Sequence, residues 1–243
     1  MGAGLIGCEF ANDLLHAGHR VHVVDPSDRP LAALLPADVG EALREALASL
    51  GVQWHFGATV QSVEEHVDTD VEAQANQSGF AVVLSNGVRL QADAVLSAIG
   101  LRADMRLAAA AGLHCERGIM TGALLQTSAR GIYALGDCAQ YASAGQRTLP
   151  FVMPIMHAAR ALAATLAGTA TPLNFPIMPV SVKTPALPIV VAPPQPGIAG
   201  SWLAEGGCAG AWRFMDAGNV QRGFVLAGTP TSRRMEFTKS TRE

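Results

Sequence analysis

Three glycines near the start of the chain have the spacing of a dinucleotide-binding turn. Gly2, Gly4 and Gly7 stand in "GAGLIG", directly before a helix that the apolar spacing predicts up to a cap at Gly18. Glycines let backbone N–H groups at a helix N-terminus approach a doubly charged pyrophosphate closely. Alone, the triplet could be an ordinary tight turn, so the residues that follow it decide the interpretation.

A carboxylate stands where such a turn needs one. The segment "RVHVVD" predicts a strand over residues 20 to 25, and it ends at Asp25. An acid there accepts hydrogen bonds from ribose hydroxyls and repels a 2′-phosphate, so the pattern favours NADH over NADPH. Arg29 could weaken that preference, and Asp25 could instead be a turn-forming residue of "DPSD".

A second carboxylate follows a second expected strand. Residues 92 to 100, "ADAVLSAIG", and 131 to 139, "GIYALGDCA", both predict buried strands that end near glycine. The second delivers Asp137 to the end of a strand, where open α/β sheets bind ligands and a carboxylate can hold a polyol hydroxyl. Asp137 could instead cap the next turn.

Other segments supply the elements that position these residues. A helix is expected over 38 to 50, with Asp38 as its N-cap and Gly51 at its end, and a long apolar helix within 150 to 168. Asn86-Gly87 predicts a type I′ hairpin turn, and residues 66 to 79 a solvated loop. The remaining expected segments are strands at 52–56, 59–65, 80–84 and 88–91, short strands around Trp202, Trp212 and residues 223–228, and a polar tail over 231–243.

Composition excludes several classes of function. The 243 residues are 49% hydrophobic and 15% charged with a net charge of −3, which predicts a globular protein with no nucleic-acid or membrane partner. The four cysteines form no C-x-x-C pair, so we expect neither a redox dithiol nor a metal site. His157 and Arg160 interrupt the longest apolar helix, and the first basic side chains are His16 and Arg20, so we expect a cytoplasmic protein.

Taken together, the motifs resemble those of the FAD-dependent pyridine nucleotide-disulfide oxidoreductases. Within that superfamily the chain looks most like the rubredoxin-NAD reductase family. The segments that carry the likeness are "GAGLIGCEFAN", "LLPADVG", "AIGLRAD", "GIYALGDCAQY", "LPFVMPIMHAARALAATLAG" and "SVKTPALPIVVAPP".

The resemblance implies an α/β fold class with three parts. These are a doubly wound, Rossmann-type NAD-binding domain with a β-meander over 1–99, lacking its first strand, an incomplete FAD-type domain over 100–171, and a small α+β acceptor-binding domain over 172–243. The chain then corresponds to roughly the last three-fifths of such an enzyme, beginning just after the first strand of its NAD-binding domain. A central strand of this kind would bury several apolar side chains at roughly 1.5–3 kcal/mol each, so we expect its loss to destabilise that domain. We therefore expect the isolated chain to bind little FAD and to turn over no NADH.

The same resemblance implies FAD and NADH as cofactors and assigns residues to them. The glycines and Glu9 would line the NADH site, and Gly100 would lie on the loop that joins the two domains. Asp137 would bind the FAD ribitol, and the start of the helix near Val152 would approach the flavin. Lys183 would lie near the flavin, or be a solvated strand lysine. The cofactor-binding residues so implied are Gly2, Gly4, Ile6, Gly7, Glu9, Asp25, Gly100, Gly136, Asp137, Val152 and Lys183.

The implied reaction is electron transport: a hydride passes from NADH to FAD, then single electrons pass to rubredoxin or a similar small iron–sulfur carrier. No catalytic side chain is required, and His157, Trp202 and Trp212 are expected to serve packing. Two alternatives stay open. One is a non-catalytic truncated remnant or NAD-binding module, and the other an NADH-dependent flavoprotein that reduces ferredoxin, a nitrite reductase module or oxygen.

Overall fold

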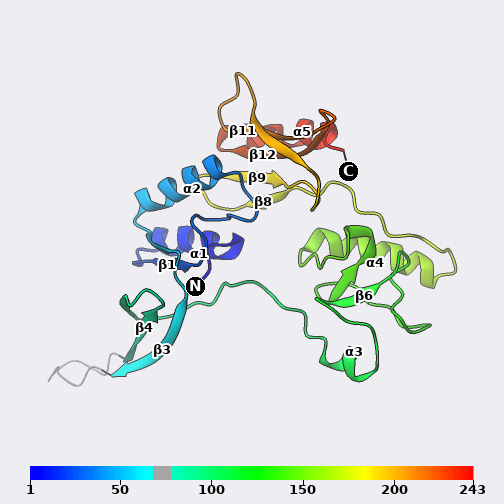
Figure 1. Ribbon diagram of the computed structural model, residues 1–243, viewed down its shortest axis with the longest axis horizontal. Coiled ribbons are helices and arrows are strands. Elements are labelled where there is room, and N and C mark those ends of the chain that lie inside the picture. Colours follow the sequence, from blue (N-terminus) through cyan, green and yellow to red (C-terminus); the bar gives the residue numbers. More distant parts are fainter. Residues whose placement is uncertain (68–77, 243) are drawn as a thin grey trace. The chain divides into compact units, whose positions relative to one another are not determined.

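The computed structural model describes residues 1–67 and 78–242 and consists of two compact units (Figure 1). The first unit combines Met1–Gly100 with Pro179–Glu243, and the second is Leu101–Met178. Residues from the two ends of the sequence therefore share one unit. The expected three-domain division at 99 and 171 stays a prediction.

The first unit opens with a glycine turn, a helix and a parallel strand pair. The elements are α1 (Leu5–His16), β1 (His22–Asp25), α2 (Ala37–Leu50) and β2 (Gln53–Phe56), and β1 pairs with β2 in parallel from His22↔Gln53 to Asp25↔Phe56. α1 ends at His16 with Ala17 as its C-cap, and Gly18 (φ +85°) follows directly; α2 ends at Leu50 with the expected Gly51 (φ +115°) as its C-cap.

One expected helix cap is wrong. The N-cap of α2 is Pro36, and Asp38 lies inside the first turn without capping a backbone N–H group. Its carboxylate still stands near the positive end of the helix dipole, which explains why an acid is favoured there.

A three-stranded antiparallel meander follows, in the order β3 (Val60–Val67), β4 (Ser78–Leu84), β5 (Arg89–Ala92). The hairpin is confirmed but its expected turn type is wrong. Leu84 N–H bonds to Val88 O at 2.9 Å, which leaves a three-residue loop, and of that loop Gly87 alone has a positive φ, of +84°. A type I′ turn needs positive φ at both central residues. Of the expected loop over 66–79, the ends belong to β3 and β4, and 68–77 lie outside the described residues.

The expected strand over 92–100 is wrong beyond Ala92, where β5 ends. Met1 supplies its pairing: the Met1 amino group donates to Leu96 O at 2.7 Å, and Ala98 N–H donates to Met1 O at 2.8 Å. A strand needs a continuous partner ladder, and pairing with a single residue does not make one. Ile99, expected to be buried, is 77% exposed.

The end of the chain forms a five-stranded antiparallel sheet in the order β10-β11-β12-β9-β8, in which β10, β11 and β12 are the short strands expected around Trp202, Trp212 and residues 223–228. Its elements are β8 (Val180–Val182), β9 (Ile189–Ala192), β10 (Gly200–Ala204), β11 (Ala211–Asp216), β12 (Gln221–Ala227), η2 (Thr229–Arg233) and α5 (Arg234–Ser240).

Apolar side chains of β8, β9 and β12 share one core with α1 and α2, and Trp202 and Trp212 pack against it. This shared core explains why the two segments form one unit.

The expected polar tail is instead helical. Phe237 in α5 is fully buried, 5.6 Å from the Phe224 ring and beneath the Arg213 guanidinium, which lies 4.0 Å from its ring centre. Burial of one aromatic side chain is enough to anchor this polar helix, because such a ring removes a large apolar area from water.

The second unit contains α3 (Arg106–Ala110), a parallel pair of β6 (Ile119–Thr121) and β7 (Ala139–Tyr141), η1 (Ala142–Ala144) and α4 (Val152–Leu166). The expected strand over 131–139 is wrong. Tyr133 makes an isolated bridge to Gln126, and β7 begins only at Ala139. The reason is a turn at Gly136 (φ +87°), closed by Ala139 N–H to Gly136 O at 3.1 Å. Within the described ranges, no helix is long and apolar enough to cross a membrane.

Candidate nucleotide-binding site

The three glycines at the start of α1 have different surroundings. Gly2 has φ +95°, and a Cβ there would overlap the carbonyl oxygen of Ala98. A Cβ on Gly7 would overlap the carbonyl oxygen of Gly2, whereas a Cβ on Gly4 would have no atom within 4 Å. Gly2 and Gly7 therefore permit the tight turn and close packing, and Gly4 leaves open space in front of the helix N-terminus. This is the division of roles that a pyrophosphate-binding turn requires.

Asp25 holds this turn from the end of β1. Its Oδ2 accepts a hydrogen bond from Ala3 N–H at 2.7 Å, and its Oδ1 accepts one from Ser27 N–H at 2.8 Å. An ionised carboxylate offers about four acceptor positions, so two bonds leave capacity for ribose hydroxyls. Asp25 thus lies where the sequence predicts it, beside the glycine turn.

Arg29, which could have attracted a 2′-phosphate, is engaged elsewhere. Its Nη1 donates to both carboxylate oxygens of Asp28, at 2.7 and 2.9 Å. The ion pair offsets the positive charge of Arg29.

Two side chains of α1 form hydrogen bonds with the C-terminal segment. Glu9 Oε1 accepts a hydrogen bond from Lys183 N–H at 2.8 Å, and Asn12 Oδ1 accepts one from Ala186 N–H at 3.2 Å. Glu9 and Lys183 are 174 positions apart in sequence, yet the structure brings them together. The Lys183 side chain is exposed, and Ile6, on the first turn of α1, is 51% exposed.

Sequence reasoning missed Asn12. It is 1% exposed on a helix face that otherwise buries Gly7, Cys8 and Ala11. A polar residue on the buried stripe of an amphipathic helix is the feature that could have revealed it, because such a side chain needs a hydrogen-bond partner.

Cys8 lies beneath the turn and is chemically quiet. Burial, with smaller contributions from the charges of Asp25 and Glu9, raises the pKa of the Cys8 thiol to about 12. Its Sγ lies 3.4 Å from Ala3 O and donates to it. The thiol therefore acts as a small packing group, as expected from its position.

The residues expected to hold a flavin lie at two places in the second unit. Gly136 and Asp137 form the turn before β7, where a Cβ on Gly136 would meet open space and the Asp137 carboxylate is exposed. Val152 is the first residue of α4 and is 73% exposed. Gly100, with φ +94°, ends the first segment of the other unit, at the junction.

Tyr141 fixes the Gly136 turn and is a second residue that the sequence did not indicate. Its hydroxyl accepts from Gly136 N–H at 2.7 Å and donates to Gly136 O at 3.2 Å. Burial raises the pKa of Tyr141, so the phenol stays protonated and keeps its donor. The turn that presents Asp137 is thus held from inside.

Comparison with known sequences gives two matches that divide the chain. Residues 1–164 match the pyridine nucleotide-disulphide oxidoreductase family, and residues 172–241 match the rubredoxin binding C-terminal domain.

Individual relatives agree with these matches. A rubredoxin-NAD(+) reductase from Acinetobacter baylyi is 46% identical over 241 residues, which cover 98% of this chain and 58% of the relative. A nitric oxide reductase FlRd-NAD(+) reductase from Aeromonas salmonicida is also 46% identical, covering 96% of this chain and 57% of its own length. This chain therefore spans about three-fifths of the length of these relatives.

Among solved structures, a ferredoxin reductase from Rhodopseudomonas palustris superposes with a TM-score of 0.83 at 24% identity, covering 100% of this chain and 59% of that one. The likeness confirms the expected α/β, Rossmann-type fold class. With the glycine turn, Asp25 and the family match over two-thirds of the sequence in agreement, the chain belongs to the pyridine nucleotide-disulphide oxidoreductase family.

Proposed function

We propose that this chain supplies the NADH-binding and acceptor-binding parts of an FAD-dependent oxidoreductase that passes electrons from NADH to a rubredoxin-type iron–sulfur protein. The observation that carries the proposal is the glycine turn. Backbone atoms leave no room for a Cβ on Gly2 or Gly7, whereas Gly4 faces open space. The match of residues 172–241 to a rubredoxin binding domain supports the choice of acceptor.

In this proposal, the chain's own residues bind and orient the nicotinamide cofactor. Backbone N–H groups at the start of α1 bind the pyrophosphate, with Gly4 leaving room for its approach. Asp25 accepts hydrogen bonds from the ribose and disfavours a 2′-phosphate by like-charge repulsion, while the Arg29–Asp28 ion pair keeps the nearby cation occupied.

Residues of the second unit fit a flavin. The Asp137 carboxylate stands exposed on a turn fixed by Tyr141, where it can accept a ribitol hydroxyl, and the exposed first turn of α4 offers backbone N–H groups beside Val152. FAD, when bound, accepts a hydride from NADH and releases electrons singly. The protein's part is to position the cofactors, and no side chain is assigned an acid or base role.

A second candidate for the electron acceptor is the FlRd protein named in the other group of relatives. The FlRd-NAD(+) reductase is as similar to this chain as the rubredoxin-NAD(+) reductase is, at 46% identity each. We favour a free rubredoxin because of the C-terminal domain match. Cytoplasmic location is part of the proposal, supported by four cysteines that are all free thiols, as in a reducing compartment.

The test compares NADH with NADPH binding to the 243-residue chain by fluorescence titration. The wild type is expected to bind NADH about tenfold more tightly, and Asp25→Asn to narrow that ratio to about threefold or less, since the like charge is gone. Asp38→Asn makes the same change at an exposed site in α2 and should leave the ratio unchanged. Equal affinities in the wild type would contradict the assignment of Asp25.

A further inference from the structure

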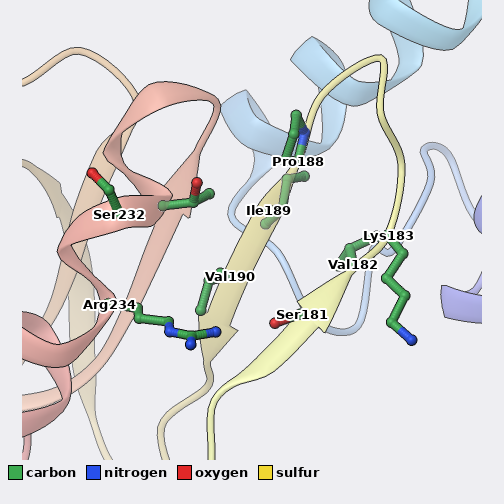
Figure 2. A pocket seen from close by; sticks show the side chains of 9 residues that line it. Ser181, Val182, Lys183, Pro188, Ile189, Val190, Ser232 and Arg234 are labelled. Atoms are coloured by element: carbon green, nitrogen blue, oxygen red, sulfur yellow. The ribbon is translucent and has the colours of Figure 1, made fainter.

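The first unit carries a surface cavity far along the sequence from the glycine turn (Figure 2). It has a volume of about 530 Å³ and lies between β8 and β9 on one side and η2 with the start of α5 on the other. Its residues are Ser181, Val182, Lys183, Pro188, Ile189, Val190, Thr231, Ser232 and Arg234. The lining combines buried aliphatic side chains with hydroxyl groups and two cations.

Charge is unevenly distributed along the chain. Residues 179–243 contain seven Lys and Arg against four Asp and Glu, whereas residues 1–178 contain ten against sixteen. The cavity therefore lies in the cationic part of an otherwise acidic protein. Such a field attracts an acidic partner and speeds its approach.

Three of those seven cations are already paired with acids of the same segment. The described acids of this segment each bind an arginine: Arg213 pairs with Glu205, Arg222 with Asp216 at 2.7 Å, and Arg233 with Glu236 at 2.6 Å. No ion pair involves Lys183 or Arg234 in the ranges that the structure describes.

Arg234 is placed to use its free charge inside the cavity. Figure 2 shows its guanidinium directed toward Val190 and Ser181, across the floor formed by β9, while Lys183 extends from the far side of β8. A planar guanidinium beside a hydroxyl suits a carboxylate, because both oxygens can be bound at once. Arg234 itself is exposed, so a partner can reach it.

We infer that this cavity docks the acidic face of the protein electron carrier, with a carboxylate of the carrier bound to Arg234. The inference rests on the proposed function. Val190 and Ser181 lie opposite each other on the same face of the sheet, and this apolar centre within a rim of hydroxyl and cationic groups follows the pattern of a protein–protein interface. The surplus of positive charge in residues 179–243 supplies the complementarity.

The test measures binding of purified rubredoxin to the full 243-residue chain by surface plasmon resonance in 0.15 M salt. Arg234→Glu is compared with Lys239→Glu, which makes the same charge change on α5 but outside the cavity. Arg234→Glu is expected to raise the dissociation rate about tenfold, because a direct contact becomes a repulsion. Lys239→Glu is expected to change it less than about threefold, since screening acts over about 8 Å at this salt.

Each outcome separates the docking inference from the function beneath it. Equal dissociation rates for the two variants would overturn the cavity as the docking site while leaving rubredoxin as the partner. Absence of rubredoxin binding by the wild-type chain would overturn the choice of partner and this inference together, and NADH binding would still test the nucleotide site independently. Thermal melts of both variants establish that each is folded.

Discussion

At the scale of single residues, three glycines with the same side chain perform three different tasks. Gly2 needs a positive φ, Gly7 needs the absence of a Cβ, and Gly4 needs neither for folding. Gly4 has an extended backbone, with φ −75° and ψ −170°, which any residue can adopt. The spacing in the sequence predicts all three, but only the surroundings show which one faces a ligand.

This difference gives a stability prediction. Gly7→Ala should lower the free energy of unfolding by about 1–3 kcal/mol, because its Cβ would overlap Gly2 O. Gly4→Ala should change that free energy by less than about 1 kcal/mol, because its Cβ meets open space and the loss of a glycine N-cap opposes the reduced freedom of the unfolded chain. Urea denaturation of both variants measures the contrast, and equal losses would show that the turn is packed differently.

Cys8 gives a pH prediction. Its folded pKa of about 12 lies above that of an unfolded thiol, about 8.5, so the unfolded state binds fewer protons between these values. Stability from this group is complete below about pH 8.5 and is lost as pH rises toward 12, by at most about 1.4 kcal/mol per pH unit.

Cys8→Ala removes that titration. Between pH 9 and 11 its unfolding free energy should fall less steeply than that of the wild type, because every other titratable group is the same in both proteins. Parallel pH profiles from urea denaturation would mean that the Cys8 thiol is accessible in the folded state.

At the scale of elements, α1 has two roles: its N-terminus forms part of the candidate nucleotide site, and its side chains bind a loop that is distant in sequence. Glu9 and Asn12 accept the backbone N–H groups of Lys183 and Ala186, so the loop that follows β8 is fixed to the nucleotide-binding helix. This loop carries Lys183, which also lines the cavity.

Asn12→Ala is therefore expected to destabilise the protein by about 1–3 kcal/mol, because the partly buried Ala186 N–H would lose its acceptor. Asn12→Asp keeps an acceptor and should recover part of that loss. Asn86→Ala is the matched control: Asn86 accepts from Val88 N–H at 3.2 Å, but at an exposed turn where water can replace it. If Asn86→Ala lowered the free energy of unfolding as much as Asn12→Ala, the proposed role of Asn12 in fixing this loop would be contradicted.

The sequence predicted elements well where the information is local. The α1 and α2 helices, the meander and the C-terminal strands follow from periodicity and turn residues close to them in sequence. The strands expected at 92–100 and 131–139 failed because pairing decides them. Beyond Ala92, the backbone of the first forms hydrogen bonds only with Met1 among the described residues, and the second turns at Gly136. The α5 helix was missed because Phe237 binds a sheet that local pattern cannot show.

The candidate site divides in the same way. Glycine spacing and Asp25 were readable because a contiguous loop, helix and strand carry them. Asn12 and Tyr141 were not, because their partners, Ala186 and Gly136, became visible only in the folded chain. The residues expected to hold a flavin stay predictions, and their placement on a turn and a helix start is compatible with them.

At the scale of the whole molecule, one unit joins the nucleotide turn and the candidate docking cavity. Met1–Gly100 and Pro179–Glu243 share a core, although 78 residues separate them in sequence. The C-terminal segment therefore supports the folded position of α1 and also carries the proposed docking face. Loss of its core contacts would weaken the nucleotide site too.

The most direct measurement of the central claim is a calorimetric titration of the 243-residue chain with NADH, beside the variant Gly4→Val. A nucleotide site at the start of α1 predicts one saturable site in the wild type and an affinity at least about tenfold weaker in Gly4→Val, since the new side chain fills the open space that the ligand needs. A cooperative thermal melt establishes that this N-cap variant is folded. Equal NADH affinities for the two proteins, or no saturable binding by the folded wild type, would contradict the claim.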